Sequence, residues 1–416
     1  MKGLLINYLK NFRGFSYEIW ILTIITFINR MGAMAMPFLT KYLHENLSYS
    51  LTEVGWLMGA IGLGSLFGNW IGGQLTDKYG FYTIMLVSLV LVGFGFMALL
   101  FLYSFTEMFI GLFLLTAFAD IYKPAMYVAV GKFSKPENRT RSLTLIRLGS
   151  NLGIIAGPVL GGFLVTVASY DSLFFIDGGT SLLAVILLMF FIDDNKMAII
   201  WSDVEQRVAS TSKYLISSSF VLLLCCVFVT AFLFYQVFTV LPLYNTQKFK
   251  FTQVEIGLLL SLNGIIVFLF EMPIVAYLEK KKVAVTKIIF AGSIFMSCGF
   301  ITLLISNYIF LLVISMFLIT TGNLLILSFS NTFALSMSRI GMEGRYMALY
   351  SMSFSVAQIF SPEIGLLISN KFSFSHNWFF MSLVSLVGIA IYYLLHKKTI
   401  SQKTISQKTI TELKNS

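Results

Sequence analysis

The sequence has few charged residues for its length. Only 12% of its 416 residues are Asp, Glu, Lys or Arg, and 57% are hydrophobic, whereas a soluble globular chain carries roughly 25% charged residues. A chain of this size cannot bury so much apolar surface in a water-soluble core. The composition therefore excludes a soluble protein and predicts a membrane protein.

Cysteine and histidine are scarce, with three of each. Cys225, Cys226 and Cys298 all fall inside long apolar segments, so we expect neither a disulfide framework nor a zinc site. The histidines lie at segment ends, and no cluster of metal ligands or nucleophile motif accompanies them. The pattern G-x-x-x-x-G-K-[ST] is also absent, which argues against ATP as the energy source. We expect no enzyme activity and no cofactor.

Long apolar runs occupy almost the whole chain. A helix needs roughly 20 apolar residues to cross the hydrocarbon layer, and backbone polar groups in lipid must bond within their own segment. The runs are continuous, unlike the alternating strands of about ten residues in a membrane barrel. The predicted fold is therefore all-α, with twelve transmembrane helices in two pseudo-symmetric bundles of six. The predicted spans are 19–43, 54–75, 82–103, 108–130, 143–167, 173–192, 219–244, 256–278, 285–305, 309–333, 347–368 and 378–395.

The basic residues favour one side of the membrane. With the N-terminus inside, the outer segments hold only Lys41, Lys248, Lys250 and Lys371 of the 29 Lys and Arg. An excess of basic residues in inner loops is typical of membrane proteins and places both termini in the cytoplasm. We expect a multi-pass protein of a bacterial inner (cytoplasmic) membrane, and we attribute the net charge of +10 to this orientation rather than to nucleic-acid binding.

One long polar connection divides the spans into two sets of six, and the sets share features in the same order. Leu51-Thr52-Glu53-Val54 is echoed by Phe251-Thr252-Gln253-Val254 where each set enters its second span. Such parallel repeats are typical of transporters. The predicted parts are a cytoplasmic amphipathic N-terminus (1–18), a six-helix bundle (19–192), a cytoplasmic linker (193–218), a second bundle (219–396) and a cytoplasmic tail (397–416), which we expect to be disordered because it is polar and repetitive.

The loop after the second predicted span reads Gly73-Gln74-Leu75-Thr76-Asp77-Lys78-Tyr79-Gly80. It resembles the inner-loop signature G-x-L-x-D-R/K-x-G of the major facilitator superfamily, although Phe81 and Tyr82 stand where the family usually has basic residues. A tight turn needs glycine, and a carboxylate is favoured near the positive N-terminus of a helix. The resemblance implies a gating role on the cytoplasmic side for Gly73, Asp77, Lys78 and Gly80. The implied partner is the N-terminus of the eleventh span near Gly344 and Arg345.

The fifth predicted span contains Gly153, Gly157-Pro158 and Gly161-Gly162. This matches the pattern G-x-x-x-G-P-x-x-G-G, which within the superfamily is typical of proton-driven drug exporters. Glycines four residues apart share one helix face and let another helix approach, and proline loosens the helix backbone. The resemblance favours efflux, and helix packing alone is the alternative interpretation.

Ionisable residues inside the spans are the most informative, because each costs about 2.5–3.5 kcal/mol at the membrane midplane on insertion scales. Asp120 and Lys123 share one face of the fourth predicted span, and Arg30 lies near the middle of the first. In the superfamily these two spans line the cavity, so we expect the three side chains to meet there. A purely structural Asp120–Lys123 ion pair is the alternative.

Intramembrane acids outnumber intramembrane bases. They are Asp120, Asp177, Glu271 and Glu363 against Arg30, Lys123 and Arg147. A buried carboxyl without a base is driven towards its neutral form and is suited to carry protons. We predict Asp120 as the proton carrier and Glu271 as the second candidate, with Arg147 as a partner of Glu271 in an ion-pair network. We expect Asp177 and Glu363 to be solvated at the outer ends of their spans.

The resemblance also implies a substrate cavity between the halves, near the midplane. Its predicted lining is Arg30, Lys123, Phe27, Tyr127, Tyr235, Gln236, Asn263 and Asn323. The predicted function is secondary transport by a monomer, with a small molecule, protons and the lipid bilayer as partners. Proton-coupled efflux (antiport) of a small amphiphilic compound is favoured. The alternative is proton-coupled uptake (symport) of a polar or anionic nutrient, because Arg30 and Lys123 suit a carboxylate or phosphate.

Overall fold

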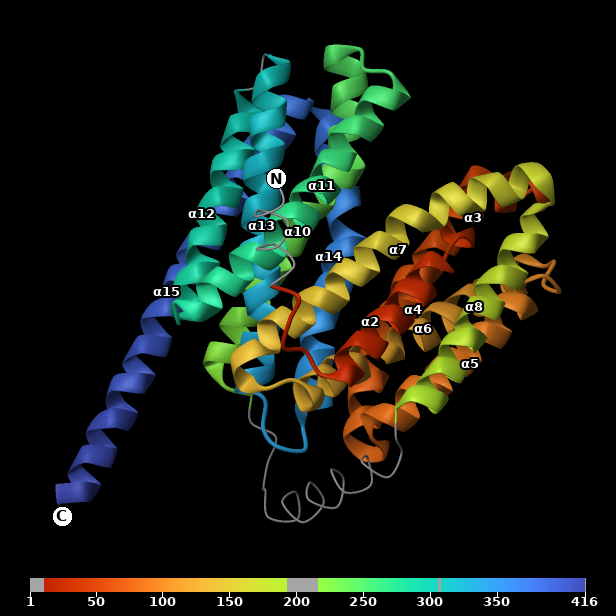
Figure 1. Ribbon diagram of the computed structural model, residues 1–416. Helices are drawn as coiled ribbons and strands as arrows, with labels where there is room; N and C mark the ends of the chain where they lie inside the picture. The colour runs from red at the N-terminus through yellow and green to blue at the C-terminus, as the bar shows by residue number, and fades with distance from the viewer. Residues whose placement is uncertain (1–10, 193–215, 306–307, 416) are drawn as a thin grey trace, which may run out of the picture. The chain divides into compact units, whose positions relative to one another are not determined.

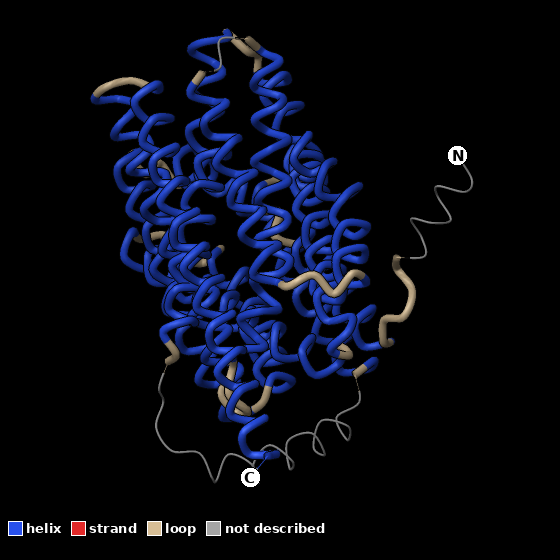
Figure 2. Tube along the Cα trace, turned by 90° about the vertical axis from the view of Figure 1, so that its left-hand side faces the viewer, coloured by secondary structure: helices blue, strands red, loops and turns tan. Residues whose placement is uncertain are grey.

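The computed structural model describes residues 11–192, 216–305 and 308–415, and within these ranges all regular structure is helical (Figures 1 and 2). Most of the predicted amphipathic N-terminus (1–18) and of the predicted linker (193–218) lies outside the described residues. Residues 11–16 form turns and extended chain, and the first described helix starts at Tyr17.

The chain divides into two compact units. The first comprises Met1–Ser212 with Ser338–Ser355, and the second comprises Lys213–Met337 with Val356–Ser416. The first contains α2 (Tyr17–Met31), α3 (Ala35–Lys41), α4 (Leu51–Tyr79), α5 (Phe81–Leu99), α6 (Phe105–Phe133), α7 (Arg139–Val167), α8 (Tyr170–Phe191) and the first part of α14 (Glu343–Lys371). The second contains α10 (Ser218–Phe249), α11 (Gln253–Lys280), α12 (Val285–Leu304), α13 (Ile309–Met337), the rest of α14, and α15 (Phe374–Asn415).

Eleven helices in the described residues are long and apolar enough to cross a membrane. Each overlaps one predicted span, from the second to the twelfth. The first predicted span is present as two shorter helices, α2 and α3, separated at Gly32–Met34. The predicted all-α fold with twelve membrane helices is confirmed, with an interruption in the first.

The second span of each half begins with a helix cap, two positions out of register with the sequence echo. Ser50 caps α4, and its backbone N–H donates to Glu53 Oε2 at 2.8 Å. Thr252 caps α11 in the same way, with its N–H 2.8 Å from Glu255 Oε2. Reciprocal capping of this kind satisfies backbone N–H groups that have no partner within the helix. The same capping arrangement therefore fixes where the helix begins in each unit, although the capping pairs, Ser50 with Glu53 and Thr252 with Glu255, are not the residues matched in the echo.

Glycines bring helices of the first unit into backbone contact. On α7, a Cβ added to Gly153 would lie 2.7 Å from both Arg30 Cβ and Phe27 O of α2. An added Cβ on Gly157 would lie 3.0 Å from Met31 O, and one on Gly161 would lie 3.0 Å from Phe38, with Gly162 looser at 3.7 Å. The α7 helix stays regular through Pro158. The glycine pattern therefore forms the face on which α7 packs against α2 and α3.

The interruption of the first span is stabilised by Asp177 of α8. Its Oδ1 accepts the N–H of Met34 at 2.9 Å, and its Oδ2 accepts the N–H of Ala35 at 2.8 Å. The side chain is fully buried, so the expectation that Asp177 is solvated at an outer span end is wrong. Two backbone N–H groups at the start of α3 therefore take the place of water as its hydrogen-bond partners.

Substituting Asp177 is expected to destabilise the protein. Asp177→Ala leaves both buried N–H groups unpaired, which costs about 1–3 kcal/mol for each such group, so the melting temperature of the purified protein should fall by several degrees. Asp171→Asn, at an exposed position in the first turn of the same helix, is the matched control. Equal melting temperatures for the two variants would show that the cap adds no stability.

The C-terminal tail also differs from the prediction. We expect disorder over 397–416, whereas α15 continues to Asn415. The physical reason lies in the composition, because neither glycine nor proline follows Gly388 and nothing in the tail therefore ends the helix.

Candidate functional site

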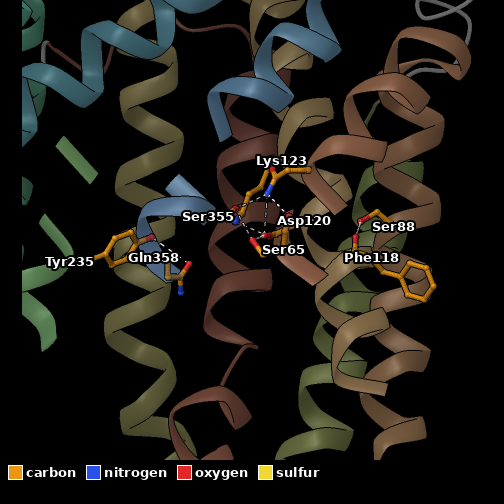
Figure 3. Close-up of polar contacts among 9 residues, drawn as sticks. Ser65, Ser88, Phe118, Asp120, Lys123, Tyr235, Ser355 and Gln358 are labelled. Carbon is orange, nitrogen blue, oxygen red and sulfur yellow. Dashed lines mark hydrogen bonds and ion pairs between the residues drawn. The ribbon is translucent and has the colours of Figure 1, made fainter. Parts of the chain in front are cut away.

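Asp120 lies at the centre of a buried polar cluster in the first unit (Figure 3). Its side chain comes from α6 and the residue is only 9% exposed. Lys123, one turn later, places its Nζ 2.7 Å from Asp120 Oδ1. Ser65 Oγ donates to Asp120 Oδ2, and Asn69 Nδ2 lies 3.3 Å from the same oxygen. One cation and two neutral donors thus satisfy both carboxylate oxygens.

A residue of α14 completes the cluster. Ser355 Oγ lies 2.9 Å from Ser65 Oγ and 3.3 Å from Asn69 Nδ2, and Figure 3 shows Ser355, Ser65, Asp120 and Lys123 pointing toward one another. We define the Asp120 cluster as Asp120, Lys123, Ser65, Asn69 and Ser355. It joins three helices around one carboxylate.

Close helix packing explains why short side chains reach Asp120. The glycines at positions 64, 68 and 72 of α4 face α6, and Cβ atoms added there would collide with the backbone at Phe113, Ala117 and Ile121. Ser65 and Asn69 follow two of these glycines directly and are buried. Ser65, Asn69 and Ser355 were not predicted from the sequence. Their only local signal is the position of two of them beside the glycine face of α4.

Arg30 is not among the contacts of the Asp120 cluster in the described residues, so the expected meeting of Arg30, Asp120 and Lys123 is only partly met. Arg30 and Phe27 are half-buried on α2, where that helix packs against Gly153. Lys123 pairs with Oδ1 of Asp120, and the donors Ser65 and Asn69 of α4 bind the other oxygen, Oδ2. Tyr127 of α6 lies farther along, with its ring edge against Tyr350 of α14 at a centroid distance of 6.3 Å.

The inner-loop motif contacts the N-terminus of α14 within the first unit. Asp77 Oδ1 accepts the N–H of Gly344 at 2.6 Å, and Oδ2 accepts the N–H of Arg345 at 3.1 Å. The Arg345 guanidinium lies 3.5 Å from the same Oδ2. Gly80 ends α4 with φ of +90°, a conformation that favours glycine. Lys78 is exposed at this end of α4.

Gly73 sets the distance between α4 and α14. A Cβ at this position would lie 2.6 Å from Gly344 O and would collide with Ala348. The motif therefore combines a close backbone approach at Gly73 with a carboxylate at a helix N-terminus, where the helix dipole favours negative charge. The gating role of these residues stays a prediction.

In the second unit, Gln236 holds three helices together. The residue is fully buried on α10, and its amide Nε2 donates to Ser361 O at 2.5 Å and to Ser361 Oγ at 2.9 Å, both on α14. Its Oε1 accepts from Asn377 of α15 at 3.4 Å. Both ends of the amide are thus engaged, and this geometry favours a packing role over a place in the substrate cavity.

The other predicted residues of the second unit lie in separate contacts. Tyr235 donates to Gln358 at 3.4 Å (Figure 3), and Asn263 donates to Thr320 Oγ1 at 2.8 Å. Asn323 is buried on α13. Glu271 is fully buried and accepts from Ser328 Oγ at 3.1 Å. Arg147, half-buried on α7, belongs to the first unit, and its pairing with Glu271 stays a prediction.

These helices and their intramembrane polar clusters define a multi-pass membrane protein. The model of the Major Facilitator Superfamily matches residues 19–362, and the chain belongs to this superfamily of transporters.

Similar proteins agree with this membership. An uncharacterized MFS-type transporter, YttB of Bacillus subtilis, is 24% identical over 83% of this chain and 86% of its own length. A multi-drug resistance efflux pump PmrA homolog of Lactococcus lactis is 28% identical over 39% of this chain and 40% of its own length. The crystal structure of a bacterial homologue of the iron transporter ferroportin, in an outward-facing state, aligns with a TM-score of 0.73 at 14% identity, covering 91% of this chain and 99% of the other.

Proposed function

We propose that the protein exports a small amphiphilic compound in exchange for protons, by alternating access across the cytoplasmic membrane of a bacterium. The observation that carries the proposal is the Asp120 cluster. The Asp120 side chain is only 12% exposed. Its carboxylate is neutralised either by the paired lysine or by a proton, and alternation between the two provides a coupling step. The efflux-pump relative and the glycine pattern on α7 support export over uptake.

Transport of ethidium into everted membrane vesicles tests this function. Vesicles from a strain that lacks other drug exporters and produces this protein should accumulate ethidium when respiration acidifies their interior, and nigericin should abolish the accumulation. The half-buried Arg30 and Lys123 favour the rival function, uptake of an anion. Absence of ethidium transport, together with succinate or phosphate uptake by right-side-out vesicles, would replace export by symport.

The orientation in the membrane is tested by cysteine labelling. After the three native cysteines are changed to serine, Lys248→Cys should react with a membrane-impermeant maleimide added outside, because the charge distribution places it there. Lys281→Cys, exposed in the turn between α11 and α12, should react only after the membrane is permeabilised. The reverse pattern would invert the topology.

A further inference from the structure

The α4 helix and the first part of α14 meet along a row of short residues. On α4 the contacting residues are four positions apart, and on α14 they lie between Gly344 and Ser355. We define the α4–α14 seam as Ser65, Asn69, Gly73 and Asp77 with Gly344, Arg345, Ala348 and Ser355. At the helical rise of 1.5 Å per residue, the seam runs for about 18 Å along α4. Both strips lie in the first unit.

The Asp120 cluster lies at one end of this seam. Ser65 and Asn69 each form hydrogen bonds both to the carboxylate of Asp120 and to Ser355. The Asn69 Nδ2 group also donates to Ser65 O at 2.8 Å, so its remaining hydrogen is shared between Asp120 and Ser355. The hydroxyl of Ser355 therefore depends mainly on Ser65 for a defined partner.

The ionised carboxylate fixes the direction of these hydrogen bonds. An ionised Asp120 only accepts, so the single hydroxyl hydrogen of Ser65 points to Asp120. Ser65 must then accept from Ser355, which orders a chain from Ser355 through Ser65 to the carboxylate. A chain that ends on a charge is stronger than a neutral one, because charge-assisted bonds are about twice as strong.

We propose that Ser65 and Ser355 are positioning residues that transmit the charge state of Asp120 to the α4–α14 seam. When Asp120 takes a proton, its hydroxyl donates to Ser65, the Ser65 hydroxyl rotates towards Ser355, and Ser355 must turn its own hydrogen to another acceptor. No bond to hydrogen in either serine breaks, and Lys123 keeps its proton. The seam is held by a charge-assisted chain while Asp120 is ionised and loosens when Asp120 is neutral.

Among the described contacts of the Asp120 carboxylate, the charged partner comes from α6 itself and not from a neighbouring helix. Lys123 is the ion-pair partner on α6 itself, while α4 and α14 contribute only the uncharged Ser65, Asn69 and Ser355 to the carboxylate's surroundings. Arg30 on α2 and Arg147 on α7 are the charged residues nearest the middle of the helices that pack against α6. The inference rests on the proposed role of Asp120 as proton carrier.

Hydrogen–deuterium exchange of the full-length protein in nanodiscs tests the proposal at a single pH. Asp120→Asn serves as the permanently neutral form. We expect backbone exchange in residues 343–355 to rise about fivefold in Asp120→Asn and in Ser355→Ala, because each loses the charge-assisted chain. The double variant should exchange no faster than either single one, since both act on the same chain.

Two further variants make the test specific. Ser355→Thr keeps the hydroxyl and should exchange like the wild type, which separates a lost hydrogen bond from a general packing defect. Ser353→Ala removes a hydroxyl that donates to Leu349 O on the same helix and should leave exchange unchanged. Equal exchange in Ser355→Ala and Ser353→Ala, or additive effects in the double variant, would overturn the proposal. Ethidium transport is measured separately, so a failed export function and a failed relay give different results.

Discussion

Asp120→Asn is expected to abolish proton-driven ethidium accumulation in everted vesicles while leaving the protein folded. The asparagine keeps the size of the side chain and can still form a hydrogen bond with Ser65, but it has no charge and neither binds nor releases a proton. Downhill exchange of ethidium without a proton gradient should persist in part, because that process needs the conformational change but no net proton movement. Accumulation is measured by fluorescence with and without nigericin.

The control for this result is Lys123→Gln. It removes the cation 2.7 Å from Asp120 and leaves the titrating group, so its transport should remain proton-dependent with an altered pH profile. If Asp120→Asn still accumulates ethidium with the pH dependence of the wild type, Asp120 is a structural partner of Lys123. The buried Glu271 of α11 then becomes the candidate proton carrier, and Glu271→Gln is the next variant to assay.

The parts of the fold that depend on local composition were predictable. Continuous apolar runs determine the membrane helices, and a Ser or Thr followed three positions later by Glu marks where α4 and α11 begin. The partner of Asp77 was also predictable, because the motif has a known relation to the start of the eleventh span. In each case the signal lies within a few residues or within a family pattern.

The missed features depend on contacts between distant residues. Asp177 is 143 positions from Met34 along the chain. The local sign that the first span is interrupted is Pro37, in the first turn of α3, because proline is tolerated where a helix begins. Ser65 and Ser355 are 290 positions apart, and uncharged serines are too common for sequence reasoning to select them. Charged residues attract attention because lipid makes them costly, whereas the neutral groups that satisfy them have no comparable signal.

Asp77→Asn is expected to reduce transport about tenfold at unchanged expression. In the wild type the carboxylate accepts two backbone N–H bonds, from Gly344 at 2.6 Å and from Arg345 at 3.1 Å, and an asparagine offers only one acceptor oxygen while its amide hydrogens face a second donor. The loss of one charge-assisted bond is worth about 1.5–3 kcal/mol, and 1.4 kcal/mol changes an equilibrium tenfold, so the state that contains this contact becomes less populated.

Arg345→Gln separates the two contributions to this contact. The Arg345 side chain is 40% exposed and lies 3.5 Å from Asp77 Oδ2, and an exposed ion pair contributes roughly 0–1 kcal/mol. Its backbone N–H survives the substitution, so transport should fall by less than about fivefold. If transport falls as much in Arg345→Gln as in Asp77→Asn, the ion pair stabilises this contact and the backbone N–H bonds do not. Wild-type transport in Asp77→Asn would limit Asp77 to the turn that joins α4 to α5, since the backbone N–H bonds at the start of α14 would then have no bearing on the transport cycle.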